Sequence, residues 1–203
     1  MANFNWHIGS YQKGRATSQS DYIWRRNNFH GINDLVASGS GNLPHWCNNN
    51  PAIFFGAADC YERQNGSACR HLVLTLPLEL SLSEWISLVE TYIALDIGPK
   101  PFQYAIHNPS KGGLGHPHVH ILYSDRVPDE LDRPAETFFR RHNPVSPTFG
   151  GCKKDSGGQS PMQMRISVIK RKALWAEVLN QALEAAGYSA RVDHRAREAI
   201  IGG

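Results

Sequence analysis

Three histidines lie on two short stretches that have the character of β-strands. His118 and His120 are separated by Val119, and His107 ends the preceding stretch Phe-Gln-Tyr-Ala-Ile-His. In a strand, residues i and i+2 point to the same face, so His118 and His120 share one face. If the stretches pair antiparallel with His107 opposite His118, then Ala105 lies opposite His120 and the third imidazole joins that face. Such a triad would bind a divalent metal and leave coordination positions open for a phosphate.

Tyr22 is the candidate nucleophile for chemistry on that phosphate. It lies in Ser-Gln-Ser-Asp-Tyr-Ile-Trp-Arg-Arg, near the start of a short predicted helix, with Arg25 and Arg26 three and four positions later. These spacings put both guanidinium groups on the helical face of the phenol, where they could also hold phosphate oxygens. Ionising a phenol with a pKa near 10 costs about 4 kcal/mol at neutral pH, and nearby positive charge offsets part of that cost. The composition is also compatible with a core tyrosine beside a solvated basic turn.

Two further basic pairs could follow a nucleic-acid backbone. They are Arg140-Arg141 and Lys153-Lys154, and they are interleaved along the chain with Phe138, Phe139 and Phe149. Cations that track phosphates and rings that stack on bases are typical of a groove for single-stranded nucleic acid. A solvated basic surface is the alternative for each pair taken singly.

Five short segments alternate apolar and polar residues between Gly, Pro or Asn, which predicts five strands. They cover residues 5–9, 71–76, 102–107, 118–124 and 189–194. Residues 175–186 repeat apolar side chains at helical spacing, and Ser81 with Glu84 forms a capping box at the start of another helix. Residues 18–26 and 51–63 are further predicted helices. The expected fold is α+β: an antiparallel sheet of about five strands carries the histidine triad, and helices pack on it.

Composition indicates one ordinary globular domain over residues 1–203. Hydrophobic residues make up 41% and charged residues 19%, and the formal net charge is +3, which is compatible with a nucleic-acid partner without establishing one. No signal-peptide pattern or membrane-length apolar run is present, and the four cysteines form no Cys-x-x-Cys pair, so a cytoplasmic protein with reduced thiols is expected. A Pro-, Gly- and Ser-rich insertion at about residues 143–161 is predicted to be flexible.

Short motifs follow one another in a fixed order along nearly the whole chain. They are Asp21-Tyr22-Ile23, Ala57-Ala58-Asp59, Leu76-Pro77-Leu78-Glu79-Leu80, Ala105-Ile106-His107, His118-Val119-His120, Arg133-Pro134, Gly150-Gly151 and Arg191-Val192-Asp193-His194-Arg195. Each motif alone is weak, but the ordered set is specific. In this order they resemble the MobA/MobL family of plasmid mobilisation relaxases, which are His-hydrophobe-His single-strand endonucleases.

The resemblance implies a site- and strand-specific DNA relaxase that nicks the transfer origin of a mobilisable plasmid. Tyr22 matches the family's nucleophile, and His107, His118 and His120 match its metal-binding triad. The reaction would be a transesterification that forms a 5′-phosphotyrosyl link and a free 3′-OH, and its reversal would rejoin the strand after conjugative transfer. The implied cofactor is a divalent metal, Mg2+ or Mn2+.

The resemblance also implies partners. These are single-stranded DNA at the transfer origin, accessory mobilisation proteins, and a type IV coupling protein with its secretion channel, through which the protein would be exported with the DNA. Relatives often continue into further domains, so the chain is expected to be the relaxase domain of a longer protein.

One departure from the family pattern concerns the strand that enters Leu76-Pro77, where members often carry acidic residues. His71 and Val73 occupy those places here, so no carboxylate that could orient the histidines is evident there. His71 is a candidate substitute as a base, and a plain strand histidine fits the sequence equally well.

Two other functions fit the same residues. One is a rolling-circle replication initiator or single-strand transposase of the same class. The other is a non-catalytic single-strand DNA-binding module whose histidines hold a structural metal, which a closed four-ligand site would favour.

Overall fold

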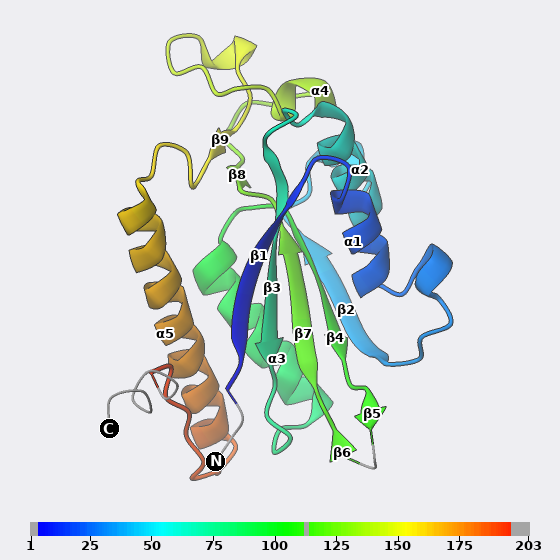
Figure 1. The fold of residues 1–203 in the computed structure, drawn as a ribbon, viewed down its shortest axis with the longest axis vertical. Coiled ribbons are helices and arrows are strands. Elements are labelled where there is room, and N and C mark those ends of the chain that lie inside the picture. The colour runs from blue at the N-terminus through cyan, green and yellow to red at the C-terminus, as the bar shows by residue number, and fades with distance from the viewer. Residues whose placement is uncertain (1–3, 112–113, 196–203) are drawn as a thin grey trace.

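A five-stranded antiparallel sheet forms the centre of the molecule (Figure 1). The computed structural model describes residues 4–111 and 114–195. The strands lie in the order β1 (Trp6–Gln12), β3 (Ser67–Thr75), β7 (His118–Tyr123), β4 (Phe102–His107) and β2 (Leu35–Gly41). Helices cover the sheet on both faces. The predicted α+β class and the sheet that carries the histidine triad are therefore confirmed.

The sheet separates two hydrophobic cores, one on each of its faces. On one face, Leu72, Ile106 and Ile121 pack with residues of α3 (Leu82–Tyr92) and α5 (Pro161–Ala185). On the other face, Ala105 and Leu122 pack with residues of α1 (Ala16–Ile23) and α2 (Pro51–Tyr61). Figure 1 shows α5 running along the side of the sheet beyond β1. Because side chains alternate along a strand, each strand contributes to both cores.

Two of the helices begin at capping boxes. The Ser81 hydroxyl accepts from the backbone N–H of Glu84, and the Glu84 carboxylate accepts from the backbone N–H of Ser81, as the sequence predicted. Ser160 and Gln163 form the same arrangement at the start of α5, with Pro161 at the first helical position. α5 therefore starts well before the predicted residue 175.

The predicted strand at residues 189–194 is wrong. Val192 is buried, but its backbone N–H and C=O both pair with the side-chain amide of Asn180 on α5, at 2.9 and 3.0 Å. The Asn180 side chain thus pairs the backbone N–H and C=O of Val192 that a neighbouring strand would otherwise have paired.

The fifth strand is instead β2, an edge strand that the sequence analysis missed. Its sequence, LVASGSG, ends in four serine or glycine positions in a row and has little alternation. The glycines have a packing reason, because a Cβ on Gly39 would lie 2.6 Å from the Tyr104 ring and one on Gly41 would lie 2.7 Å from the Phe102 ring.

Residues 143–161 contain short regular elements rather than an uninterrupted loop. Pro147–Phe149 form a 3₁₀ turn (η4), and β9 (Lys153–Lys154) pairs with β8 (Arg126–Val127). The flexibility predicted for this segment stays a prediction. The remaining elements are η1 (Asn27–Phe29), η2 (His45–Cys47), the π-helical turn η3 (Ile93–Ile97), β5 (Ser110–Lys111), β6 (Leu114–Gly115) and α4 (Ala135–Phe138). Among the described helices, none has the length and apolar character needed to cross a membrane.

Candidate active site

The three histidines converge on one face of the sheet. β4 and β7 pair with His107 opposite His118 and Ala105 opposite His120, the register predicted from the sequence. Each imidazole offers one nitrogen such that these atoms lie within 4.8 Å of one another. This face is the one covered by α1 and α2, since Ala105 belongs to the core that those helices share. The hairpin geometry therefore suffices to assemble the cluster.

Backbone carbonyls fix the tautomers of two of these histidines. His107 Nε2 lies 2.7 Å from the Ile23 carbonyl oxygen, and His118 Nδ1 lies 2.8 Å from the His116 carbonyl oxygen. A carbonyl only accepts, so these nitrogens must carry the hydrogens. The lone pairs are then left on His107 Nδ1 and His118 Nε2. This arrangement, in which the second nitrogen donates to an outer partner, is typical of metal-binding histidines.

His120 is oriented by another histidine instead of a carbonyl. Its Nδ1 lies 2.8 Å from His71 Nε2, and the two rings are stacked with centroids 5.0 Å apart. The other nitrogen of His71 lies 3.5 Å from the Tyr11 hydroxyl. His71 thus hydrogen-bonds to a member of the triad from outside it. The sequence showed only that a histidine stands where relatives often have an acidic residue.

The cluster fits a divalent metal ion. Burial lowers the pKa of His107 to about 4 and that of His120 to about 2, so both imidazoles are neutral at pH 7, the form that binds metals. The set within reach of one ion comprises three residues among those described, fewer than the four ligands of a closed structural zinc site.

Stability of the metal-free protein should therefore decrease as the pH falls. Burial also lowers the pKa of His71 to about 4, against about 6.5 for an unfolded histidine. A group whose folded pKa is depressed contributes its full stability above the unfolded pKa and loses it as the pH falls towards the folded pKa, here between about 6.5 and about 4. Urea unfolding at pH 7 and pH 5 should show a lower midpoint at pH 5. His71→Gln should reduce this difference, and equal midpoints for the wild-type protein would contradict the expectation.

Tyr22 lies beside the histidine cluster. Its ring meets that of His120 edge-on with centroids 6.0 Å apart, and it packs edge-on against Phe29 at 5.3 Å. The side chain is half-buried. Tyr11 approaches the same cluster from β1 through His71, so the site contains two phenols, and Tyr22 is the one in ring contact with the triad.

Asp59 fixes the helix that carries Tyr22. Its carboxylate accepts from the backbone N–H groups of Gly14, Ala16 and Thr17 at 2.7–3.0 Å, and from the Thr17 hydroxyl at 2.7 Å. α1 has no side-chain cap of its own at Arg15, so this aspartate on α2 satisfies its free N-terminal donors. The sequence analysis noted Asp59 only as part of a motif.

Arg25 does not extend the helical face of Tyr22, because α1 ends at Ile23 and Arg25 has a left-handed φ of 52°. The chain turns back there, and the guanidinium lies 4.7 Å from the centre of the Tyr22 ring. Two of its nitrogens donate to the Asp34 carboxylate at 2.7 and 2.8 Å, and Nη2 also lies 3.1 Å from His107 Nδ1. Arg25 is therefore already paired with a carboxylate, and it lies where it would compete with a metal for that nitrogen.

Asp34 is a site residue that the sequence analysis missed. It lies just before the unrecognised strand β2, and its backbone carbonyl accepts from the N–H of Asn108, next to His107. The hydrogen bond from Arg25 and the nearby His107 help to hold the pKa of its carboxyl below the usual range. A carboxylate is thus linked to the cluster through Arg25, from the side opposite β3. Arg26, the other predicted phosphate ligand, lies over the Trp24 ring at 4.2 Å.

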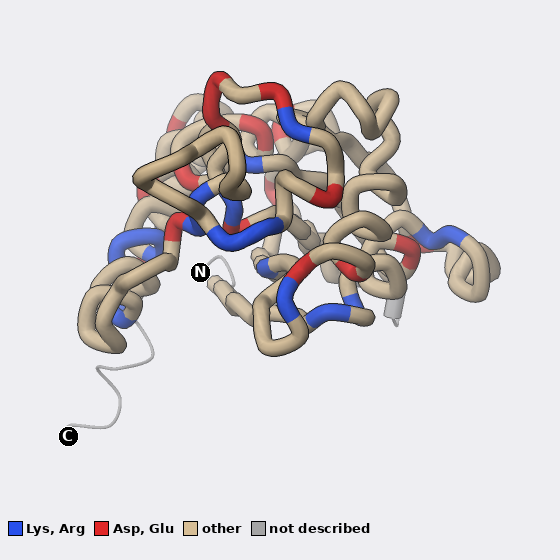
Figure 2. Tube along the Cα trace, turned by 90° about the horizontal axis from the view of Figure 1, so that it is seen from above, with Lys and Arg blue, Asp and Glu red and all other residues tan. Residues whose placement is uncertain are grey.

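The other predicted DNA-binding residues lie away from the histidines, around β8, β9 and α4. Arg140, Arg141 and Lys153 are exposed there, whereas Lys154 pairs with the buried Glu62 at 3.2 Å. Figure 2 views the molecule from this end and shows Lys and Arg scattered among Asp and Glu. Phe138 and Phe139 are buried in the core and cannot stack on bases, which corrects the expectation for these two rings.

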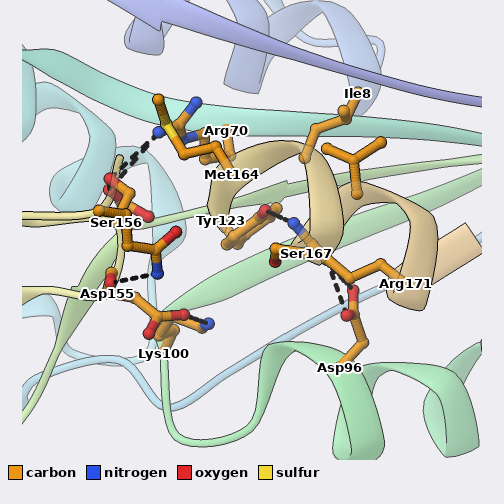
Figure 3. A pocket seen from close by; sticks show the side chains of 13 residues that line it. Ile8, Arg70, Asp96, Lys100, Tyr123, Asp155, Ser156, Met164, Ser167 and Arg171 are labelled. Atoms are coloured by element: carbon orange, nitrogen blue, oxygen red, sulfur yellow. Dashed lines mark hydrogen bonds and ion pairs between the residues drawn. The ribbon is translucent and has the colours of Figure 1, made fainter. Parts of the chain in front are cut away.

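A separate cavity of about 200 Å³ lies on the opposite face of the sheet, between α5 and β7 (Figure 3). Each of its cations already has an acidic partner. Arg171 binds Asp96 at 2.6 Å, Lys100 binds Asp155 at 2.7 Å, and Arg70 lies 3.7 Å from Asp125. The first two pairs join α5 and the loop before it to η3 and the segment between η3 and β4, the third joins β3 to the segment just after β7, and we assign all three a structural role.

Comparison with known proteins places the chain among mobilisation proteins. The model of the MobA/MobL family matches residues 10–199. A 43 kDa relaxation protein of Salmonella typhimurium is 33% identical over 98% of the chain, and Mobilization protein A of Escherichia coli is 33% identical over 94% of it. The chain spans 55% and 26% of the lengths of these two relatives.

Two solved structures share the fold. One, described as the molecular basis of vancomycin resistance transfer in Staphylococcus aureus, has a TM-score of 0.70 at 17% identity, covering 95% of this chain and 98% of that one. The other, the conjugative relaxase TrwC in complex with OriT DNA in a metal-free form, has a TM-score of 0.54 at 11% identity, covering 93% and 72%. With the family model matched over nearly the whole length, the chain belongs to the MobA/MobL family.

Proposed function

We propose that this protein is a plasmid mobilisation relaxase that nicks one strand of a transfer origin through Tyr22. The observation that carries the proposal is the contact between the Tyr22 ring and His120, within a cluster whose three donor nitrogens lie within 4.8 Å of one another. A phenol beside an open metal site is an arrangement suited to transfer of a phosphodiester to tyrosine.

In the proposed step, the Tyr22 hydroxyl oxygen attacks the scissile phosphorus. The bond from phosphorus to the 3′ oxygen breaks as the bond to the phenol oxygen forms, so the products are a 5′-phosphotyrosyl link and a free 3′-OH. The phenol loses a proton and the departing 3′ oxygen gains one. His107, His118 and His120 would hold a divalent ion, Mg2+ or Mn2+, which polarises the phosphate and stabilises its developing charge. The covalent link conserves the phosphodiester energy, so the reverse reaction rejoins the strand.

The buried groups around Tyr22 would keep this geometry in place. Arg25 lies against the Tyr22 ring and is itself held by Asp34, so its positive charge can favour the phenolate without leaving its carboxylate partner. The proposed partners are single-stranded DNA at the transfer origin, accessory mobilisation proteins, and a type IV coupling protein with its secretion channel, through which a cytoplasmic protein would be exported. The relatives are longer than this chain, and these partners are proposals for the whole protein.

His71 should tune metal affinity through its contact with His120. Replacing it with leucine removes the partner of His120 Nδ1, and loss of such an outer partner typically weakens metal binding about 10- to 100-fold. His45→Leu is the matched control, because His45 is an exposed histidine on η2 that belongs to neither the triad nor its partners. Calorimetric titration with Mn2+ would measure both variants. Dissociation constants within twofold of wild type for His71→Leu would contradict the assignment.

The function can be tested before the nick sequence has been identified. The DNA flanking the coding region is searched for an inverted repeat, and that segment is cloned into a supercoiled plasmid. Protein with Mg2+ or Mn2+ should convert this plasmid to open circles and leave the parent plasmid supercoiled. Cutting of a replication origin or an element end in place of the transfer origin would favour an initiator or a transposase. Binding of single-stranded DNA without any cutting would favour a non-catalytic module.

A further inference from the structure

A second group of cations is held rigidly at the end of the molecule formed by β8, β9 and α4. The guanidinium of Arg126, which is 2% exposed, donates to both oxygens of Glu62 at 2.9 Å. It also donates to the backbone carbonyls of Phe139, Arg140 and Cys152. One buried arginine thereby ties the segment that carries Arg140-Arg141 to the segment that leads into Lys153-Lys154.

The two segments touch at Gly151. A Cβ at this position would lie 2.3 Å from the Arg140 carbonyl oxygen, so only glycine allows the approach. The backbone N–H of Gly151 donates to the Arg141 carbonyl, and that of Cys152 donates to the Phe138 carbonyl, at 3.2 and 3.1 Å. The exposed cations on either side therefore project from a fixed backbone.

A cavity of about 250 Å³ lies at this junction, and we call it the basic cup. It is lined by Arg63, Arg126, Arg141, His142, Cys152, Lys153, Lys154 and Gly157, and none of these described residues is acidic. Arg126 and Lys154 share the single negative charge of the buried Glu62. Within the described part of the chain, no ion pair involves Arg63, Arg141 or Lys153. Like charges held together repel, and an anion in the cup would relieve that repulsion.

An exposed aromatic ring stands on the same rigid backbone. Phe149 is 77% exposed and is joined to Cys152 through Gly150 and Gly151 only. The side chain of Arg133, 4% exposed, donates to the carbonyls of Pro147 and Gly150 at 3.1 and 2.9 Å, on both sides of this phenylalanine. Gly150 in turn packs against Asn143, where a Cβ would lie 2.5 Å from the backbone nitrogen. The fold thus holds the backbone on both sides of an exposed apolar ring, three residues before Cys152 of the cup.

We propose that the basic cup binds one phosphodiester group of single-stranded DNA, through Arg63, Arg141 and Lys153, and that Phe149 stacks on a neighbouring base. A cation for the phosphate and a ring for an unstacked base are the two elements by which proteins hold single strands. A duplex does not offer the base face that Phe149 requires. The inference rests on the proposed function only in taking DNA as the ligand, and it assigns a contact away from the Tyr22 centre.

The test uses fluorescein-labelled dT20 in chelator-containing buffer, with anisotropy recorded at several salt concentrations. The double variant Arg141→Gln/Lys153→Gln should bind dT20 about tenfold or more weakly at low salt, with a salt slope shallower by about 0.7 for each phosphate that the variant no longer neutralises. Phe149→Ala should weaken binding about tenfold or more, as expected for one stacked base, and leave the salt slope unchanged. Both variants alter exposed side chains, and equal thermal unfolding midpoints would verify their folding.

The control is Arg165→Gln/Lys170→Gln, which removes the same charge from exposed positions of α5. An equal loss in this control, or dT20 affinity unchanged in the cup variant, would overturn the proposal. Replacing phosphates of dT20 with neutral methylphosphonate linkages should weaken its binding to the wild-type protein more than its binding to the cup variant. Inorganic phosphate could also bind the cup without changing the affinity for dT20. That result would identify a site for free anions and would overturn the proposal.

These readouts separate this inference from the nicking proposal. If the cup variant keeps its dT20 affinity while Tyr22→Phe abolishes covalent adduct, only the assignment of the cup fails. If the cup variant loses dT20 affinity while no protein forms adduct on any candidate origin, the cup stands and the nicking proposal fails.

Discussion

Tyr22→Phe should abolish the covalent protein–DNA adduct while preserving single-strand binding. The substitution removes one hydroxyl and keeps the ring that packs against Phe29 and His120. Among the described residues Tyr22 is the tyrosine in ring contact with the triad, so without its hydroxyl the rate of adduct formation should fall to background. DNA affinity depends on phosphate contacts and stacking, so it should stay within about twofold of wild type.

The matched control is Tyr11→Phe. Tyr11 reaches the cluster only through His71, at a hydroxyl-to-nitrogen distance of 3.5 Å, and burial helps to raise its pKa, which disfavours the phenolate. The control should still form adduct. Oligonucleotides spanning the nick site, incubated with each variant and resolved on a denaturing gel, would compare them. An adduct that survives Tyr22→Phe and disappears in Tyr11→Phe would assign the nucleophile to Tyr11.

Removal of the metal should have the second large effect. His118 is the least buried member of the triad, so His118→Ala should leave the core intact and remove one ligand. A bound metal contributes several kcal/mol to stabilising charge on a reacting phosphoryl oxygen, and about 4 kcal/mol corresponds to about a thousandfold in rate. We expect nicking by His118→Ala, and by chelator-treated wild type, to fall by at least about that factor.

Binding of dT20 should be almost unchanged in both cases, because that affinity comes mainly from phosphate contacts and base stacking elsewhere on the protein. Addition of Mn2+ should restore the chelated wild type and not the variant. Cutting at the full rate after chelation would contradict a catalytic role for the metal.

The sequence was sufficient to predict the histidine triad because its geometry is local. Two strands joined by a hairpin follow the period-two rule, so fixing His107 opposite His118 also fixes Ala105 opposite His120. The capping box at Ser81 is a local signal of the same kind, and it was found. The ordered motifs gave the family, which the match over residues 10–199 confirms.

Features that depend on long-range packing were not predictable in this way. β2 owes its glycines to the rings of Tyr104 and Phe102 on β4, and missing that strand also concealed Asp34. The helical spacing assigned to Arg25 failed because the chain reverses at a left-handed residue directly after α1. Phe138 and Phe139 stand next to the basic pair Arg140-Arg141, which suggested surface rings, but they pack against Phe54 of α2 in the core. Neither hydrophobicity nor spacing reveals which face of such a short helix is covered.

The most direct test of the account is to locate the DNA on the protein after the reaction. Trypsin cleaves after Lys13, Arg15 and Arg25, so Tyr11 and Tyr22 fall on different peptides, and residues 16–25 contain Tyr22 as their only tyrosine. Adduct formed on a nick-site oligonucleotide with Mn2+ would be treated with nuclease, digested and analysed by mass spectrometry. The account predicts a nucleotide attached to Tyr22 in the peptide covering residues 16–25, and only when metal is present. A nucleotide on the Tyr11 peptide, or an adduct of the same yield without metal, would contradict it.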